Sequence, residues 1–97
     1  MNKERQHVVL TIAGSDSSGR AGIQADIATI RSTGCHAATV ITAVTAQNRT
    51  GVQAIHAIPT EIVEAQIRSV IKDTTPSSIK IGMIYNAEIT KCIVRTI

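Results

Sequence analysis

Residues 14–26 read GSDSSGRAGIQAD, and they connect the apolar run VVLTIA to a segment with helical periodicity. Ile23, Ile27 and Ile30 share one face of that segment, which predicts an amphipathic helix. The stretch is therefore the end of a strand, a polar loop with glycines and the start of a helix. Because such junctions present backbone N–H groups at the carboxyl end of a parallel strand, where open α/β sheets bind ligands, this loop is the first candidate site.

The rest of the chain continues to alternate between strands of the buried type and amphipathic helices. We expect strands over residues 8–13, 37–44 and 79–84, a weak flap or edge strand over 52–58, and helices over 21–32, 60–73 and from Asn86 onward. Thr60 and Asn86 are the expected N-caps. A strand, a helix and a second strand of this kind form a right-handed unit, so we predict an α/β fold whose mostly parallel sheet has three or four strands and three flanking helices.

Finer features of the chain carry further expectations. The sequence AQNRTG at residues 46–51 is typical of a turn. Gly34 is expected to end the first helix in the left-handed region. Apolar stripes facing the core are predicted in the later helices, with Val63, Ile67, Val70 and Ile71 in one and Ile89, Cys92, Ile93 and Ile97 in the other.

Length and composition place limits on the class of protein. The chain has 97 residues, 43% of them hydrophobic, which indicates a globular chain that makes up at most one domain, with a polar leader at 1–7. No apolar run approaches the roughly 20 residues that span a bilayer. The first residues, MNKERQH, lack the apolar core of a secretory signal, so we expect a cytoplasmic protein that does not bind membranes.

Charge and cysteine usage exclude other classes of function. The net charge is +3, its cations are scattered, and Tyr85 is the one aromatic residue, so nucleic-acid binding is not expected. Cys35 and Cys92 lie far apart without ligand spacing, which indicates small buried side chains and no metal site. The histidines are isolated and are interpreted as surface or flap residues: His7, His36 and His56.

The glycine loop is close to a P-loop pattern but does not fit it. Arg20 stands where the phosphate-binding lysine of GxxxxGK[ST] belongs, and Ala21 replaces the hydroxyl residue that holds magnesium. The loop also fails the GxGxxG pattern. It is therefore not interpreted as a nucleotide site.

Three motifs together point to a family. TIAGSDSSGRAGIQADI, VITAVTAQNRTGVQAIHAIP and KIGMI occur in that order, and they resemble the amino-terminal part of hydroxymethylpyrimidine/phosphomethylpyrimidine kinase, a thiamine-biosynthesis enzyme of the ribokinase-like superfamily. The resemblance runs from about Val8 to the last residue and covers roughly the first third of a typical member. It implies a partial ribokinase-like fold and ATP-dependent phosphorylation of 4-amino-5-hydroxymethyl-2-methylpyrimidine and its monophosphate, with ATP and Mg²⁺ as cofactors.

The resemblance also implies a set of substrate-binding residues. Gln47 would bind the aminopyrimidine, because a primary amide offers both donors and an acceptor, and Met83 would pack on the ring. From the residues alone, a turn amide and an ordinary core methionine remain alternatives, and Asp26 could be a carboxylate of the first helical turn. The implied pocket residues are Gln47, Met83, Asp26 and Asp16, with Ala13 and Val44 at the ends of the first two strands as weaker candidates.

Some parts of the family pattern are missing from the 97 residues. The GTGC-like loop with the catalytic cysteine of the family is absent, so no catalytic residue is expected in this chain and most ATP-binding groups are missing. Members usually have glycine where Arg20 stands, and a strained backbone or an intruding cation could follow. The interpretation is a truncated kinase portion that is marginal in isolation, oligomeric or complemented by another chain. The alternatives are a non-catalytic pyrimidine-binding or partner module, a degenerate fragment, and a pyridoxal-kinase-like activity.

Overall fold

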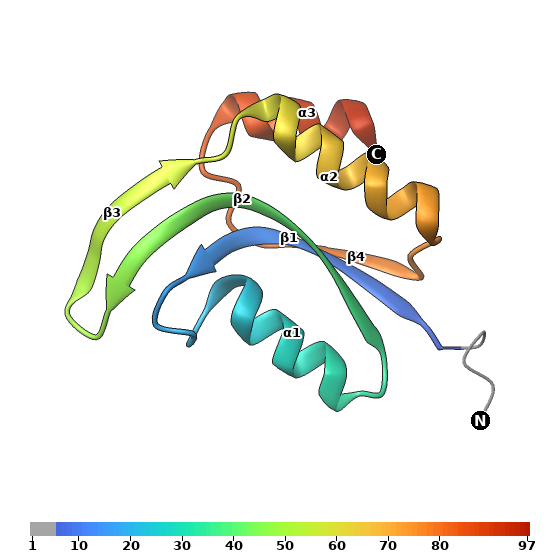
Figure 1. The fold of residues 1–97 in the computed structure, drawn as a ribbon, viewed down its shortest axis with the longest axis horizontal. Coiled ribbons are helices and arrows are strands. Elements are labelled where there is room, and N and C mark those ends of the chain that lie inside the picture. The colour runs from blue at the N-terminus through green and yellow to red at the C-terminus, as the bar shows by residue number, and fades with distance from the viewer. Residues whose placement is uncertain (1–5) are drawn as a thin grey trace.

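The computed structural model describes residues 6–97, so residues 1–5 of the expected polar leader lie outside the described part. Four strands and three helices follow one another in the described chain (Figure 1). Their bounds are β1 (Val8–Asp16), α1 (Gly22–Ser32), β2 (His36–Asn48), β3 (Gly51–Ala57), α2 (Thr60–Asp73), β4 (Ser78–Ile81) and α3 (Ala87–Thr96).

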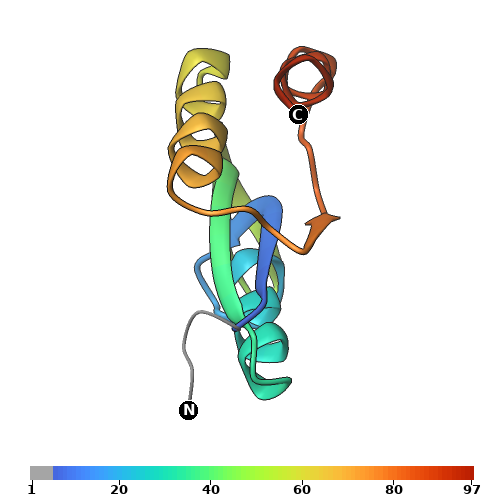
Figure 2. The ribbon, with the colours of Figure 1, turned by 90° about the vertical axis from the view of Figure 1, so that its right-hand side faces the viewer.

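The strands form one mostly parallel sheet in the order β3-β2-β1-β4. β1 pairs in parallel with β2 on one side and with β4 on the other, and β2 pairs with β3 as an antiparallel hairpin. Helix α1 lies on one face of the sheet, while α2 and α3 lie side by side on the other (Figures 1 and 2). The predicted α/β architecture is confirmed.

The core lies between the sheet and the α2–α3 layer. Leu10, Ile12 and Val40 project from the strands into this layer and are fully buried. The helices contribute Val63, Ile67, Ile89, Cys92 and Ile93. Burying one such aliphatic side chain contributes about 1.5–3 kcal/mol, so this cluster is the main source of stability.

The predicted apolar stripes extend too far along both helices. Ile71 and Ile97 were expected to face the core, and both are exposed. Ile97 lies beyond the last helical residue, Thr96. In α2, Val63 and Ile67 are buried and Val70 packs against the core only in part, so the buried stripe is narrower than the prediction.

β1 and β2 are longer than predicted at their carboxyl ends. Ser15 and Asp16 pair with Val44 and Thr45 after a register shift, so residues 14–16 belong to the strand and not to the loop. The antiparallel pairing of β2 with β3 continues to Asn48, which leaves only a two-residue turn, 49–50, from the expected turn AQNRTG. Tertiary pairing therefore holds polar residues in strands that composition alone assigned to loops.

β4 is shorter than predicted, because it ends at Ile81 and not at residue 84. Thr60 is the first helical residue of α2 and not its N-cap; Pro59 occupies the cap position and no side chain caps this end. Asn86 is the N-cap of α3 as predicted, and its side chain accepts a hydrogen bond from the Ile89 N–H at 2.9 Å. Gly34 has the expected left-handed conformation, with φ of 87°.

The isolated residues also have clear positions. Cys92 is buried as predicted, whereas Cys35 is only half-buried because it lies in the connection between α1 and β2. His7, His36 and His56 are exposed, as expected. Within residues 6–97, none of the helices combines the length and apolar character needed to cross a bilayer.

The α3 cap generates a stability prediction. Replacing Asn86 by alanine removes the acceptor for the Ile89 N–H, and we expect the free energy of unfolding to fall by about 1 kcal/mol. Asn86→Asp keeps an acceptor oxygen at the same position and is expected to stay near the parent protein. Urea unfolding followed by circular dichroism measures both variants. Equal stability of the alanine and aspartate variants would show that the cap does not stabilise α3.

Candidate functional site

A small cavity of about 160 Å³ lies where the carboxyl ends of β1 and β2 and the start of α1 meet the segment after β4. It is smaller than the roughly 300–1,000 Å³ pockets of drug-sized ligands, which favours a ligand with a single small ring. Three of the predicted residues come together here: Asp16, Gln47 and Met83. The full lining is Gly14, Ser15, Asp16, Ala21, Gly22, Thr45, Gln47 and Met83.

A larger hollow of about 890 Å³ lies at the opposite end of the sheet. It is bordered by Val8 and His36, the first residues of β1 and β2, and by the last turn of α2. Ligands of open α/β sheets bind at the carboxyl ends of the strands. The smaller cavity is therefore the candidate site, although it is not the largest one.

Asp16 organises the loop between β1 and α1. Its side chain is buried, with 3% of its surface exposed. One carboxylate oxygen accepts from the Ser18 N–H at 2.8 Å, and the other accepts from the N–H groups of Ala21 at 2.8 Å and Arg20 at 3.1 Å. The Ser18 hydroxyl donates to both oxygens. The carboxylate thus satisfies the backbone donors that a buried polar loop would otherwise leave unpaired.

These contacts determine the ionisation of Asp16. Burial raises the pKa of this carboxyl, but the hydrogen bonds from Ser18, Ala21 and Arg20 outweigh burial and hold the pKa below its usual range. Asp16 is therefore ionised near neutral pH, as an acceptor of several N–H groups must be.

Ser17 joins the loop to the end of β2. Its hydroxyl donates to the Gln47 carbonyl and accepts from the Gln47 N–H, both at 2.8 Å. One side chain therefore replaces a pair of backbone hydrogen bonds between two segments 30 residues apart. This link holds the two polar walls of the cavity together.

The orientation of the Gln47 amide follows from its neighbours. The Thr45 hydroxyl donates its only proton to the Ser15 carbonyl at 2.8 Å. Thr45 can then only accept from Gln47, so the Nε2 group must face it, at 2.8 Å. Within residues 6–97 the Gln47 Oε1 has no recorded hydrogen-bond partner, which leaves this oxygen and the second Nε2 proton for a ligand.

The remaining cavity wall combines glycine backbone with a thioether. A Cβ atom added to Gly14 would lie 2.6 Å from the Met83 Cε, so the end of the methionine side chain would have to move to accommodate it. A Cβ atom on Gly22 would overlap the Gly14 carbonyl, and Gly22 also has a φ of 59°. Met83 itself is half-exposed and follows β4 by two residues. Its polarisable side chain suits the edge or face of an aromatic ring.

Asp26 does not line the cavity. Its carboxylate accepts from the Thr11 hydroxyl at 2.6 Å and forms an ion pair with Lys80 at 2.9 Å, which ties α1 to β1 and β4. Burial raises the pKa of Asp26, but the Thr11 hydrogen bond and the hydrogen bond and charge of Lys80 outweigh it and lower the pKa. The alternative of a carboxylate in the first helical turn is wrong, because Asp26 is the fifth residue of α1.

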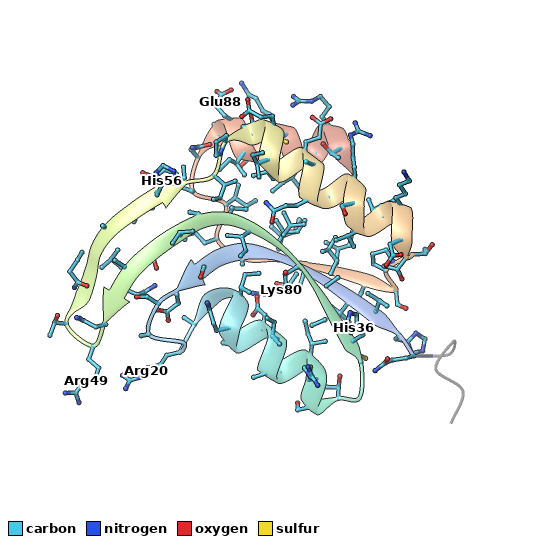
Figure 3. All side chains as sticks on the ribbon, viewed as in Figure 1. Arg20, His36, Arg49, His56, Lys80 and Glu88 are labelled. Carbon is cyan, nitrogen blue, oxygen red and sulfur yellow. The ribbon has the colours of Figure 1, made fainter. Side chains whose placement is uncertain are left out.

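The two weaker candidates lie inside their strands because both strands continue beyond them. Ala13 is buried in β1, and Val44 is half-exposed in β2, and neither lines the cavity. Arg20 is exposed and does not line the cavity either (Figure 3). Tyr85 is the one non-glycine residue with positive φ in the described chain, so Arg20 carries no strain of that kind.

The predicted set lacked Ser17, which links the two polar walls, and five residues of the cavity lining: Gly14, Ser15, Ala21, Gly22 and Thr45. Thr45 lies two residues before Gln47 on the same strand, and strand alternation places both side chains on one face. This alternation could have identified Thr45 from the sequence only if the expected strand, 37–44, had been extended to Gln47. The role of Ser17 depends on the contact between two loops, which no local pattern reports.

The site does not suit a magnesium ion or the phosphates of ATP. Both Asp16 oxygens face N–H and hydroxyl donors, which compete with a cation for the same lone pairs. Across residues 6–97 no group of three or more His, Cys, Asp or Glu side chains is placed to hold a metal ion. The donor set of this cavity is instead one of amide, hydroxyl and thioether groups.

The Asp16 contacts generate a prediction about pH. Because the pKa is lowered in the folded state, the carboxylate stabilises the loop above the pKa of unfolded aspartate, about 3.9, and this stabilisation is lost as the pH falls through the lower folded value. Asp16→Asn turns one acceptor into a donor, so we expect lower stability at neutral pH and little difference from the parent in strong acid. NMR titration of the Arg20 and Ala21 amides and urea unfolding at several pH values measure this.

A matched control removes the same charge at an exposed position. Asp73→Asn, at the end of α2, is expected to leave the titration of the Arg20 and Ala21 amides unchanged. If Asp16→Asn preserved the acid transition of those amides, the carboxylate would not be the group that orders the loop.

Comparison with known proteins places the chain among kinases. A family model described as phosphomethylpyrimidine kinase matches residues 16–97. Hydroxymethylpyrimidine/phosphomethylpyrimidine kinase of Haemophilus influenzae is 54% identical over 85 residues, which are 88% of this chain and 32% of that protein.

Solved structures show the same relationship. A crystal structure of phosphomethylpyrimidine kinase from Clostridium difficile superposes with a TM-score of 0.91 and 47% identity over 94% of this chain and 39% of the other. An ADP complex of Bacillus subtilis pyridoxal kinase superposes with a TM-score of 0.86 and 33% identity, over 94% of this chain and 35% of the other. The partial ribokinase-like fold is thereby confirmed.

The chain spans about a third of the length of the curated relatives it matches. The matched region includes most of the cavity lining, from Asp16 to Met83. The match also covers more than half of the chain. On this basis the chain belongs to the phosphomethylpyrimidine kinase family.

Proposed function

We propose that this chain supplies the pyrimidine-binding part of a kinase that phosphorylates 4-amino-5-hydroxymethyl-2-methylpyrimidine and its monophosphate in thiamine biosynthesis. The observation that carries the proposal is the fixed orientation of the Gln47 amide. Its free Oε1 can accept from the exocyclic amino group of the substrate, and its second Nε2 proton can be donated to the neighbouring ring nitrogen.

The other cavity residues fit the shape of that ring. Gly14 lets the ring approach the backbone, and Met83 provides an apolar contact from the segment after β4. Asp16 keeps the loop in place without contacting the ring through a free oxygen. Asp26 acts as a positioning residue by tying α1 to β1 and β4. In this proposal Ala13 and Val44 support the strands and do not contact substrate.

The transfer itself requires groups outside the cavity described here. Phosphoryl transfer from ATP is promoted by magnesium and by donors that stabilise the transferring phosphoryl group, and the described cavity offers neither. This chain's own residues bind the ring, orient its hydroxymethyl group and exclude water from one side. We place this function in the cytoplasm, in line with the expectation from the sequence.

Pyridoxal is a second candidate ligand. The structural similarity to a pyridoxal kinase of Bacillus subtilis favours it, and pyridoxal is also a single substituted ring with a hydroxymethyl group. It lacks the amino group that would donate to Gln47 Oε1, so we expect it to bind more weakly than the aminopyrimidine.

Calorimetric titration with the aminopyrimidine tests the site. We expect saturable binding by the 97-residue chain, weakened about tenfold or more in Gln47→Ala because two directional hydrogen bonds are lost. Gln53→Ala removes the same side chain from an exposed position on β3 and is the matched control. Unchanged affinity in Gln47→Ala would overturn the assignment, and displacement of the pyrimidine by lower concentrations of pyridoxal would favour the second ligand.

An activity assay separates binding from turnover. We expect the 97-residue chain to show no ATP-dependent phosphorylation of the pyrimidine by mass spectrometry, because the cavity lacks groups for magnesium and phosphate. The full-length Haemophilus influenzae relative is the positive control. Product formation by the 97 residues alone would contradict this prediction and show that a catalytic group has been missed. Binding without turnover would fit a pyrimidine-binding module.

A further inference from the structure

The cavity wall formed by Met83 lies outside the helices and strands. Met83 belongs to the segment between β4 and α3, residues 82–86, which leaves the sheet toward the α2–α3 layer (Figure 2). The residue is half-exposed, so packing restrains its side chain only in part. A group that meets a ligand from such a segment needs a further constraint to hold it at a fixed place.

Hydrogen bonds supply that constraint on both sides of the Met83 Cα atom. Within residues 6–97, two recorded hydrogen bonds hold residues 82–85. The Gly82 N–H donates to the Ile12 carbonyl at 2.8 Å, which continues the contact between β4 and β1 by one residue. The Thr42 hydroxyl donates to the Met83 carbonyl at 2.9 Å. The second bond is therefore the one that fixes the backbone of Met83 itself.

Thr42 makes this contact from a strand that is not a neighbour of β4. It lies on β2, and β1 separates β2 from β4 in the sheet. At the end of β1, Gly14 has no side chain, and the Met83 Cε occupies the space that a Cβ atom there would need. The Thr42 hydroxyl thus joins β2 to the segment after β4, while the thioether lies against Gly14.

The surroundings of Thr42 assign its hydroxyl to this one contact. Thr42 is fully buried and does not line the cavity. A buried hydroxyl requires a hydrogen-bond partner, and in the described chain that partner is the Met83 carbonyl. We propose that Thr42 is a positioning residue, which acts through the Met83 carbonyl and holds the thioether in the cavity wall. This role rests on the proposed function, because Met83 is the wall that would contact the ring.

Methyl NMR tests the contact in the absence of a ligand. The chain has two methionines, so labelled methionine methyls give two signals, and Met83→Ala identifies the one from Met83. We expect an NOE between the Met83 methyl and Gly14 in the parent chain and in Thr42→Ser, which keeps the hydroxyl. Thr42→Val keeps the shape of the side chain without the donor, and we expect it to lose this NOE.

Thr39→Val is the matched control, because it makes the same change on the same strand. Thr39 is half-buried and pairs with Thr11 in the β1–β2 ladder, so its substitution is expected to leave the NOE unchanged. Circular dichroism shows whether each variant is folded. If Thr42→Val is not, the parent chain decides: a bound Thr42 hydroxyl proton exchanges slowly and gives an NOE to the Met83 Hα, and its absence overturns the contact.

A double-mutant cycle separates positioning from general support of the fold. In calorimetric titration with the aminopyrimidine, we expect Thr42→Val to weaken binding about threefold or more, because the hydrogen bond that places the wall is lost. Thr42→Ser and Thr39→Val are expected to bind like the parent. In a Met83→Ala background, Thr42→Val should weaken binding no further, because the side chain that it positions is gone.

Two further outcomes would overturn the proposal. One is an unchanged NOE between Met83 and Gly14 in folded Thr42→Val. The other is an equal loss of affinity from Thr42→Val with and without the Met83 side chain, because Thr42 would then affect the cavity by another route. If the parent chain does not bind the pyrimidine, the proposed function fails, while the NOE comparison still decides whether Thr42 positions Met83.

Discussion

The structure depends on the complete enclosure of β1. Leu10 and Ile12 point to the α2–α3 layer, Thr11 points to α1, and all three are fully buried. A strand buried in this way must place its backbone groups in ladders on both edges, because no water reaches them. Those ladders come from β2 and β4, which follow much later in the chain. The central element therefore forms only when the flanking strands are in place.

The candidate site lies at the carboxyl end of this enclosed strand, which holds it in place. At the carboxyl end of β1 the core changes to a polar network, in which Asp16 binds the loop N–H groups and Ser17 and Thr45 connect the loop to β2. Because the Thr45 hydroxyl donates to the Ser15 carbonyl, it can only accept from Gln47, and this fixes the orientation of the Gln47 amide. A directional network of this kind holds a binding amide more precisely than packing alone. Each link joins two segments, so the loop and β2 depend on each other.

The sequence predicted the elements well because their apolar patterns are local. The runs before Gly14 and Gln47 are buried strands, and the stripes around Ile67 and Ile93 are core faces. The ends of strands were less predictable, since Ser15 pairs with Val44 far along the chain and Asn48 pairs with Gly51 across a turn of only two residues. The same cause hid Thr45, whose place beside Gln47 requires the longer β2.

The candidate site was predictable only in part for a related reason. Gln47 and Met83 came from the family resemblance, and the structure brings both to one cavity. Asp26 came from the same resemblance, but its hydrogen bond to Thr11 and its ion pair with Lys80 place it between α1 and the sheet. A motif match identifies a residue in the sequence, but the contacts of that residue in the fold decide whether it faces a ligand or supports the structure.

The two edges of the sheet differ in a way that bears on the cavity. β3 and β4 are both edge strands with one paired neighbour each, but β3 has seven residues and β4 only four, all of them exposed. Met83 follows β4 by two residues, so one cavity wall is attached to the shorter of the two edge strands.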